Sequence, residues 1–169
     1  NNLSSITNNG NVNVTTATGA DVQSGNLPNS VVSAINIGAG TASMTSADAT
    51  AYAATGTDGD KITVANGATL NLSSYTTQDL SGLTNTAGGS LNVTTADGAN
   101  VQAAKLHNAD VTTITIGAGA GQMTGADASA YAATGSDADK ITVNGGNLTL
   151  TAYNNNDVSA LTKNSGDVT

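Results

Sequence analysis

The chain has 169 residues and a formal net charge of −8 at pH 7, and it contains no Cys, Arg, Trp, Phe or Glu. Without cysteine it forms neither disulfides nor thiolate-ligated metal sites. Without arginine, and with an acidic balance, it lacks the basic groove that nucleic-acid binding needs. No apolar run reaches 18 residues, so we expect no membrane insertion.

Leu, Ile and Val together make up only 30 of the 169 residues, a fraction at which a highly charged chain stays disordered. Here only 9% of the residues are charged, and the apolar residues alternate with polar ones, which is typical of half-buried strands. In chain order, the alternating triplets are 12–14, 35–37, 62–64, 70–72, 91–93, 114–116, 141–143 and 148–150. We therefore expect a folded chain of many short strands around a thin core.

Two Ala-rich segments, MTSADATAYAATG at 44–56 and MTGADASAYAATG at 123–135, lack this alternation and predict one short helix each. Thr45 or Ser46 would cap the N-terminus of the first helix, and Asp48 in its first turn would complement the helix dipole. The expected C-terminal caps are Gly56 and Gly135, and the face expected to lie against the sheet comprises Met44, Ala51 and Tyr52.

A long internal repeat organises the chain. Residues 17–64 align with 96–143 without gaps at an offset of 79, with 30 identities in 48 positions. We assign residues 1–84 to a first repeat unit and 85–169 to a second, stacked as one continuous domain and excerpted from a longer array. Because many short strands recur within a long repeat, the fold class predicted is an all-β, β-helix-like β-solenoid of two units of about 79 residues, each with one helical insertion.

In the second unit, the expected strands are 80–84, 90–95, 100–104, 111–117 and 141–143 with 147–151. Clusters of Gly, Asn and Asp predict turns between them, notably at 117–121 and 144–146. Segments 77–83 and 155–161 are weaker candidates for a second helix or a 3₁₀ turn. Met and Tyr recur once per unit, Tyr75 with Tyr153 for example, so we interpret them as packing residues.

The repeated motif D-x-D-K supplies the candidate metal ligands Asp58, Asp60, Asp137 and Asp139. Carboxylates two residues apart in a loop can both reach one hard cation, so the cofactor expected here, if any, is calcium. The alternative is a solvated turn whose Asp residues pair loosely with lysine. The chain lacks the EF-hand loop and the glycine-rich calcium nonapeptide. Asp79 and Asp157 are interpreted as turn or cap residues.

No constellation of catalytic residues recurs in the two units. His107 is the only histidine, and Pro28 takes its place in the first unit, so a shared catalytic imidazole is excluded. No Asp lies in an apolar stretch that would raise its pKa for glycoside hydrolysis. We therefore expect no enzyme activity.

The module M-T-x-A-D-A-x-A-Y-A-A-T-G followed by D-K-I-T-V, and the step D-[LV]-S-[GA]-L-T followed by L-N-V-T-T, resemble repeats of long bacterial surface proteins. These include S-layer proteins and giant repetitive adhesins. The resemblance implies an extracellular, cell-surface scaffold, self-association into a lattice or filament, and frequent dependence on calcium. It implies no catalytic residues.

The function expected is that of a secreted structural protein that assembles with copies of itself into a surface layer, rod or filament. The alternative is an adhesin stalk or binding module that recognises a glycan or another cell-surface partner. Such a module needs an exposed patch that is not repeated, and the stretch that differs most between the units is 26–33 against 105–112. Lys105 and His107 are its candidate contact residues.

Overall fold

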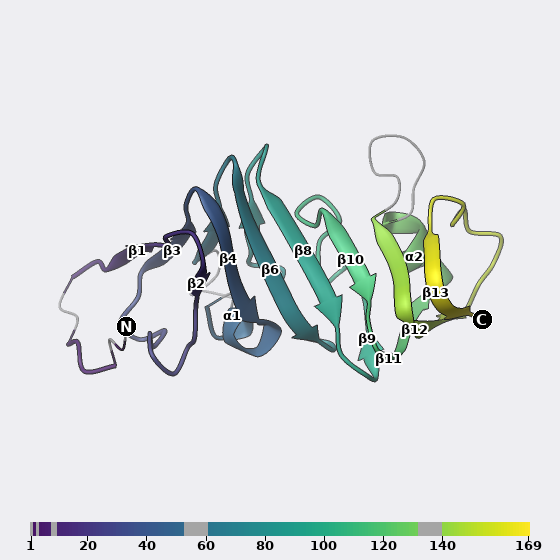
Figure 1. Ribbon diagram of the computed structural model, residues 1–169, viewed down its shortest axis with the longest axis horizontal. Coiled ribbons are helices and arrows are strands. Elements are labelled where there is room, and N and C mark those ends of the chain that lie inside the picture. The colour runs from purple at the N-terminus through teal and green to yellow at the C-terminus, as the bar shows by residue number, and fades with distance from the viewer. Residues whose placement is uncertain (1, 3, 8–9, 53–60, 132–139) are drawn as a thin grey trace.

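The computed structural model describes residues 2, 4–7, 10–52, 61–131 and 140–169. In these residues it contains thirteen β-strands and two short α-helices. Figure 1 shows the strands side by side in one elongated stack, with the N-terminal and C-terminal segments at its opposite ends. The prediction of a chain made mainly of short strands is confirmed.

The two halves of the chain contribute the same kinds of element in the same order. The first half contains β1 (Asn13–Thr15), β2 (Ala20–Asp21), β3 (Ala34–Ile37), β4 (Gly40–Thr45), α1 (Ser46–Tyr52), β5 (Ile62–Val64), β6 (Ala68–Tyr75) and β7 (Thr84–Asn85). The second half contains β8 (Ser90–Thr95), β9 (Ala99–Asn100), β10 (Thr113–Ile116), β11 (Gly119–Thr124), α2 (Gly125–Tyr131), β12 (Ile141–Thr151) and β13 (Thr162–Val168). In the second half, β12 takes the place of both β5 and β6.

All strand pairings of the described residues are parallel. Each joins strands from two successive passes, where a pass is the stretch of chain from one strand to the parallel strand that pairs with it. Val14 pairs with Ile35, 21 residues on, and Ile35 pairs with Ile62, 27 residues on, because the second pass also contains α1. One sheet has four strands in the order β1-β3-β5-β7. The other has nine, in the order β2-β4-β6-β8-β10-β12-β11-β9, with β13 beside β12.

The predicted fold class, an all-β β-solenoid, is wrong. The strands form two open sheets rather than one closed coil, and strands at equivalent places in the repeat lie in different sheets. β1 belongs to the four-stranded sheet, whereas its equivalent β8 belongs to the nine-stranded one. The reason is that β8, at six residues, is long enough to pair with β6 on one side and β10 on the other. The second half therefore extends the large sheet instead of repeating the small one.

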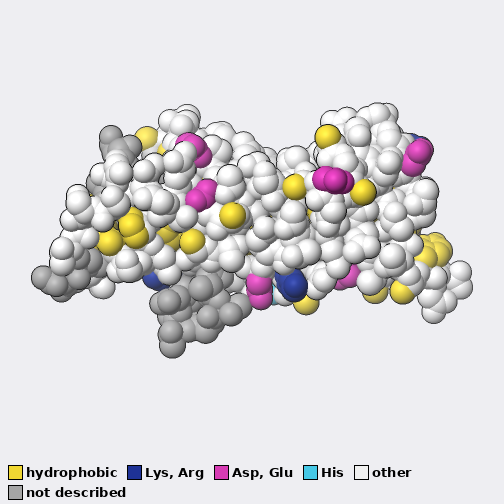
Figure 2. Space-filling view, turned by 90° about the horizontal axis from the view of Figure 1, so that it is seen from below, with side chains coloured by type: hydrophobic (Ala, Val, Ile, Leu, Met, Phe, Trp, Pro, Cys, Tyr) yellow, Lys and Arg dark blue, Asp and Glu magenta, His cyan; other side chains and the backbone are white. Residues whose placement is uncertain are grey.

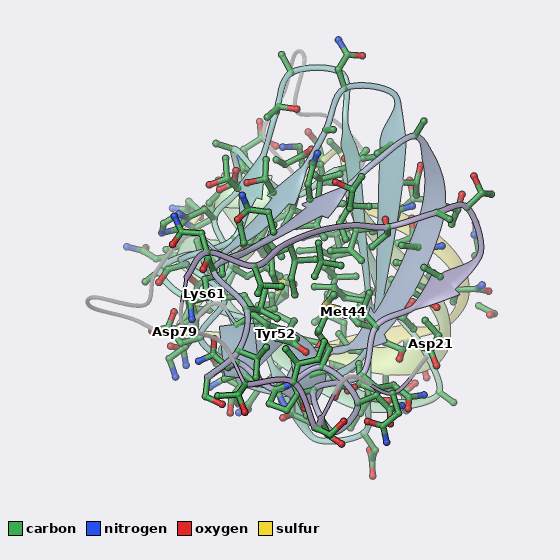
Figure 3. The ribbon with its side chains drawn as sticks, turned by 90° about the vertical axis from the view of Figure 1, so that its left-hand side faces the viewer. Asp21, Met44, Tyr52, Lys61 and Asp79 are labelled. Carbon is green, nitrogen blue, oxygen red and sulfur yellow. The ribbon has the colours of Figure 1, made fainter. Side chains whose placement is uncertain are left out.

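The core is built from apolar side chains that stack from one pass to the next. Ile35 pairs with Ile62 and Ile114 with Ile141, and all four are at most 1% exposed. Figure 3, which looks at the stack from its N-terminal end, shows side chains filling the space enclosed by the ribbon. Alternation of buried with less buried residues is clearest in β6. The alternating pattern of the sequence therefore identified the buried face of these strands correctly.

Both predicted helices are present, and each lies against the large sheet. The Thr45 hydroxyl accepts a hydrogen bond from the Asp48 N–H (3.1 Å) and donates one to Asp48 Oδ2 (2.6 Å), so Thr45 caps α1 as expected. The inward face contains Ala49 and Tyr52, both 0% exposed, while Ala51 is only half-buried. Gly56 and Gly135, the expected C-terminal caps, lie outside the described residues. No helix in the described part of the chain is long and apolar enough to cross a membrane.

Two glycine-rich segments predicted to be turns are largely strand. β11 begins at Gly119 and β12 runs unbroken through 144–146. The two strands pair from Gly119 with Gly146 onwards, and a Cβ atom on Gly146 would collide with the carbonyl oxygen of Gly117. Glycine serves here to let two strands approach closely. Segment 77–83 is neither strand nor helix, and its turn is closed by the Leu83 N–H donating to the Leu80 carbonyl (3.0 Å).

Three tyrosines are fully buried in the core, but only two of them have a hydrogen-bond partner. The Tyr52 hydroxyl donates to the Leu27 carbonyl, and the Tyr131 hydroxyl donates to the Leu106 carbonyl. The Tyr75 hydroxyl has no partner among the described residues. Burial raises the pKa of Tyr52 and of Tyr75 to about 12, so these hydroxyls stay protonated at neutral pH.

These tyrosines provide a matched test of the packing. Tyr131→Phe leaves the buried Leu106 carbonyl without its donor, so we expect the free energy of unfolding to fall by about 1–3 kcal/mol. Tyr75→Phe removes the same atom without breaking a hydrogen bond, so the expected change is less than about 1 kcal/mol, of either sign. Urea denaturation of both variants measures the difference. Equal losses would mean that the two hydroxyls have equivalent surroundings.

Candidate functional site

The predicted calcium ligands Asp58, Asp60, Asp137 and Asp139 lie outside the described residues, so the calcium site stays a prediction. The lysine that ends each motif is described. Lys61 Nζ donates to the Asn29 side-chain oxygen (2.6 Å), and Lys140 Nζ donates to the Asn108 carbonyl (2.7 Å). In the parts of the chain that the structure describes, no group of three or more His, Cys, Asp or Glu residues is placed to hold a metal ion.

Asp79 and Asp157 form turns, as the sequence predicted. The Ser81 hydroxyl (2.6 Å) and N–H (3.1 Å) both donate to Asp79 Oδ1, and Ser159 makes the same two hydrogen bonds with Asp157. These bonds, above all those from the hydroxyls, hold the pKa of both carboxylates below the ordinary value. Both aspartates therefore shape a turn in equivalent places of the two halves.

The stretch proposed for a glycan contact is a surface turn after β9. The His107 side chain is 48% exposed, and its Nδ1 lies 3.7 Å from Asp110 Oδ2. Asp110 Oδ1 in turn accepts a hydrogen bond from the Asn85 N–H (3.0 Å). Lys105 is half-buried on the same turn. A glycan-binding role for Lys105 and His107 stays a prediction.

Sequence reasoning assigned Asp48 only to the helix dipole, but the structure shows that it also links two passes of the chain. Its Oδ1 accepts hydrogen bonds from the N–H and the hydroxyl of Ser24 (both 2.8 Å). Asp127 repeats the link by accepting from the Ala103 N–H (2.9 Å). Burial is the largest single influence on the pKa of Asp48 and raises it. The hydrogen bonds from Thr45 and Ser24 together outweigh burial, so the pKa lies below its ordinary value of 3.8.

Two sets of apolar residues, one at each end of the stack, are less covered than their counterparts in the repeat, although Val22 and Leu27 are themselves only 7% and 8% exposed. We define the C-terminal face as Leu150, Tyr153, Val158 and Leu161, and the N-terminal face as Val14, Ala20, Val22 and Leu27. The repeat places counterparts of all eight in the interior: Leu72, Tyr75, Leu80 and Leu83 for the first face, and Val93, Ala99, Val101 and Leu106 for the second. Every counterpart is at most 2% exposed.

The C-terminal face exposes side chains that its counterparts bury. Tyr153 is 52% exposed, whereas Tyr75 is 0% exposed, and Leu150, Val158 and Leu161 are only partly buried. β13 pairs with β12 up to Leu148, and the Leu150 N–H donates to the Thr169 carbonyl (2.7 Å). Figure 2 shows hydrophobic atoms at the right-hand end of the molecule and others toward its left-hand end, with acidic side chains dispersed over the view. The C-terminal face is therefore an uncovered piece of core.

The N-terminal face lines a groove of about 520 Å³. Its walls include Val14, Ala17, Ala20, Val22 and Leu27, and so they come from β1, β2 and the turn that follows. Seen from this end in Figure 3, Met44 and Tyr52 lie toward the interior and Asp21 lies at the outside. The groove lies between the edge strands of both sheets, and its lining mixes these apolar residues with polar ones, namely Thr15, Thr16, Asp21, Gln23 and Asn26. The repeat was the sequence signal for both faces, because it pairs each of these residues with a counterpart that is buried inside the stack.

Comparison with protein-family models, with curated proteins and with solved structures finds no match to this chain. The resemblance to bacterial surface proteins therefore gains no support from these comparisons.

The cap and link made by Asp48 predict a specific acid sensitivity. Because its pKa in the folded chain lies below 3.8, the stabilisation is complete above pH 3.8 and is lost as the pH falls through the folded pKa. Asp48→Asn should therefore lower the free energy of unfolding at pH 7 and flatten its decline below pH 4. Asp21→Asn, which removes the same charge from an exposed strand, is the control. Urea denaturation from pH 7 to pH 2 measures both, and equal profiles would contradict the assignment.

Proposed function

We propose that this chain is a structural segment without catalytic activity that associates with copies of itself, through the ends of its strand stack, into an extended assembly. The proposal places it outside the cell, in a surface layer, rod or filament. The observation that carries it is the contrast between Tyr153 and Tyr75: the same residue at the same place in the repeat is half exposed at the end of the stack and completely buried inside it. A face that matches a core surface is stabilised when another pass covers it.

The backbone at both ends supports the same proposal. Among the described strands, β1, β2, β7, β9 and β13 each pair with one neighbour only, and β1, β2 and β13 lie toward the two ends of the stack. Such edge strands present N–H and C=O groups to whatever chain lies beyond them. Proteins that remain monomeric commonly protect such edges with lysine, proline or a covering loop. The strand β1 (NVT) has neither lysine nor proline.

The outward faces of the strands support a soluble scaffold. Asn71, Asn92 and Thr113 follow one another across β6, β8 and β10, and their side chains form a hydrogen-bonded row with distances of 3.0 and 2.9 Å. A polar row of this kind stays hydrated and does not favour lateral association. The net charge of −8 repels neighbouring stacks further. Association is therefore directed to the ends.

The extracellular location rests on the motifs that resemble bacterial surface repeats and on the lack of cysteine, arginine and lysine-rich patches. Calcium remains part of this proposal only through the four aspartates of the D-x-D-K motifs.

Self-association should be visible in the purified chain. Sedimentation velocity is expected to show a series of species above the 16.4 kDa monomer, growing with protein concentration, and electron microscopy should show rods one stack wide. Raising the salt from about 10 to 150 mM should strengthen association, because it shortens the Debye length from about 30 to 8 Å. A single monomeric species up to about 1 mM, where even ~4 kcal/mol of binding free energy would be detected, contradicts the proposal.

A further inference from the structure

We propose that each unit of the repeat forms one covalent cross-link, an isopeptide bond between a lysine and an asparagine side chain. The two bonds join Lys61 to Asn29 and Lys140 to Asn108. They would give internal cross-links to a chain that has no cysteine and therefore no disulfide. The proposal concerns the single chain and does not depend on the proposed self-association.

The contact that carries this proposal occurs twice, at equivalent places in the repeat. Lys61 Nζ lies 2.6 Å from Asn29 Oδ1 and 3.2 Å from the main-chain oxygen of Asn29. Lys140 Nζ lies 2.9 Å from Asn108 Oδ1 and 2.7 Å from the main-chain oxygen of Asn108. The amide carbon Cγ is bonded to Oδ1 at about 1.23 Å, so in both units it lies within about 4 Å of the lysine amine.

The asparagine is retained where the two units otherwise differ most. Between 26–33 and 105–112, only three of the eight positions are identical. Two of these are the apolar residues Leu27 and Val32, which belong to the core. The third is Asn29, which is polar and half-buried. Packing explains the two apolar identities, whereas the contact with lysine explains the third.

Both reaction partners are attached to backbone that hydrogen bonds hold in place. In the first unit, the Ile35 N–H donates to the Lys61 carbonyl (2.6 Å), and the turn that carries Asn29 is closed by the Val31 N–H donating to the Pro28 carbonyl (3.0 Å). The second unit has the corresponding two bonds. An amine and an amide free in solution react extremely slowly. Groups held within reach of each other gain an effective concentration of up to about 10⁵–10⁸ M.

The reaction balances without an oxidant, a reductant or a cofactor. The lysine amine is the nucleophile. A bond forms between lysine Nζ and asparagine Cγ, and the bond between Cγ and Nδ2 breaks. Starting from the ammonium form, Nζ gives up two protons, and both leave on the departing nitrogen as an ammonium ion. All four side chains are half-buried, so water reaches them and carries these protons. Each bond therefore removes one ammonia and one positive charge from the chain.

The cross-links would fix two surface turns to the core strands. Each bond joins residues 32 positions apart. In the first unit, the turn after β2 becomes attached to the start of β5, and in the second unit the turn after β9 becomes attached to the start of β12. A cross-link over a loop of this length lowers the entropy of the unfolded chain, as a disulfide does. The folded stack is stabilised as a result.

The mass of the intact chain tests the proposal. The purified full chain is kept warm and folded for several days, then denatured and measured by mass spectrometry. Two bonds lower the mass by about 34 Da below that of the sequence, because each covalent change removes about 17 Da. The chain contains no arginine.

Tryptic digestion locates the bonds, because trypsin does not cleave after a lysine whose amine has become an amide. The lysines of the chain are Lys61, Lys105, Lys140 and Lys163. With both bonds in place, cleavage occurs only after Lys105 and Lys163, so the expected fragments are 1–105, 106–163 and 164–169.

Variants assign each bond to its pair. Asn29→Ala and Lys61→Arg should each reduce the loss to about 17 Da, measured against the variant's own sequence, and restore cleavage after residue 61. Asn108→Ala should do the same for cleavage after Lys140. Asn26→Ala is the matched control on the same turn and should keep both bonds, because the Asn26 amide donates to Gln23 (2.8 Å) and not to a lysine. Circular dichroism checks folding, and if Asn29→Ala does not fold, Lys61→Arg tests the same bond.

Each outcome supports or overturns the proposal. A wild-type chain that keeps the mass of its sequence and is cleaved after Lys61 and Lys140 overturns it. A loss of ammonia with cleavage retained after both lysines also overturns it, because a succinimide at an asparagine gives that result. A bond in one unit only overturns the proposal for the other unit. Two bonds in a chain that stays monomeric support the cross-links and contradict the proposed function, so the two can fail separately.

Discussion

Parallel backbone pairing between successive passes of the chain is the constraint on which the rest of the structure depends. Each pass places an apolar residue on the apolar residue of the pass before it, as Ile62 lies on Ile35 and Ile141 on Ile114. A chain with so few Leu, Ile and Val residues cannot fill a wide core. It can fill a narrow one when each pass covers the apolar residues of the pass before it. The same dependence leaves the first and last passes incompletely shielded.

The aspartates and tyrosines of the repeat serve this stacking. Asp48 and Asp127 connect a helix N-terminus to the preceding pass, and Tyr52 and Tyr131 donate to a carbonyl of the preceding pass. The two tyrosine hydroxyls each satisfy a buried carbonyl that would otherwise lack a partner. Tyr52 and Tyr131 thus hold one pass to the next, in agreement with their interpretation as packing residues, whereas Tyr153 is 52% exposed and is not packed in the core.

The partial exposure of the two end faces has the same cause, because the burial of a residue depends on the passes that lie on either side of it. An internal pass gains its burial from neighbours on both sides, whereas β1, which contains Val14, pairs with β3 only, and Tyr153 is 52% exposed. The polar rows on the outside of the strands offer no comparable driving force, because their hydrogen bonds are already made along the row. The sides of the stack are therefore polar and hydrated, as a soluble scaffold of the kind proposed would require.

The sequence by itself determined what is local. Alternation identified most of the strands and their buried sides, and the Thr-x-x-Asp step located both helix starts. The Asp-x-Ser turns at Asp79 and Asp157 could be recognised from residue types alone. The strands expected at 80–84 and 100–104 were wrong, because the strands there are only Thr84–Asn85 and Ala99–Asn100. Tertiary structure decided what depends on residues 20 or more positions away. It decided that Gly119 and Gly146 lie in paired strands, that β1 and β8 belong to different sheets despite equivalent sequences, and that Tyr75 is buried while Tyr153 is not. A residue's type determines its local conformational preference, but its strand pairing and its burial are determined by the residues that lie next to it in space. Identical residues with different neighbours therefore differ in pairing and in burial.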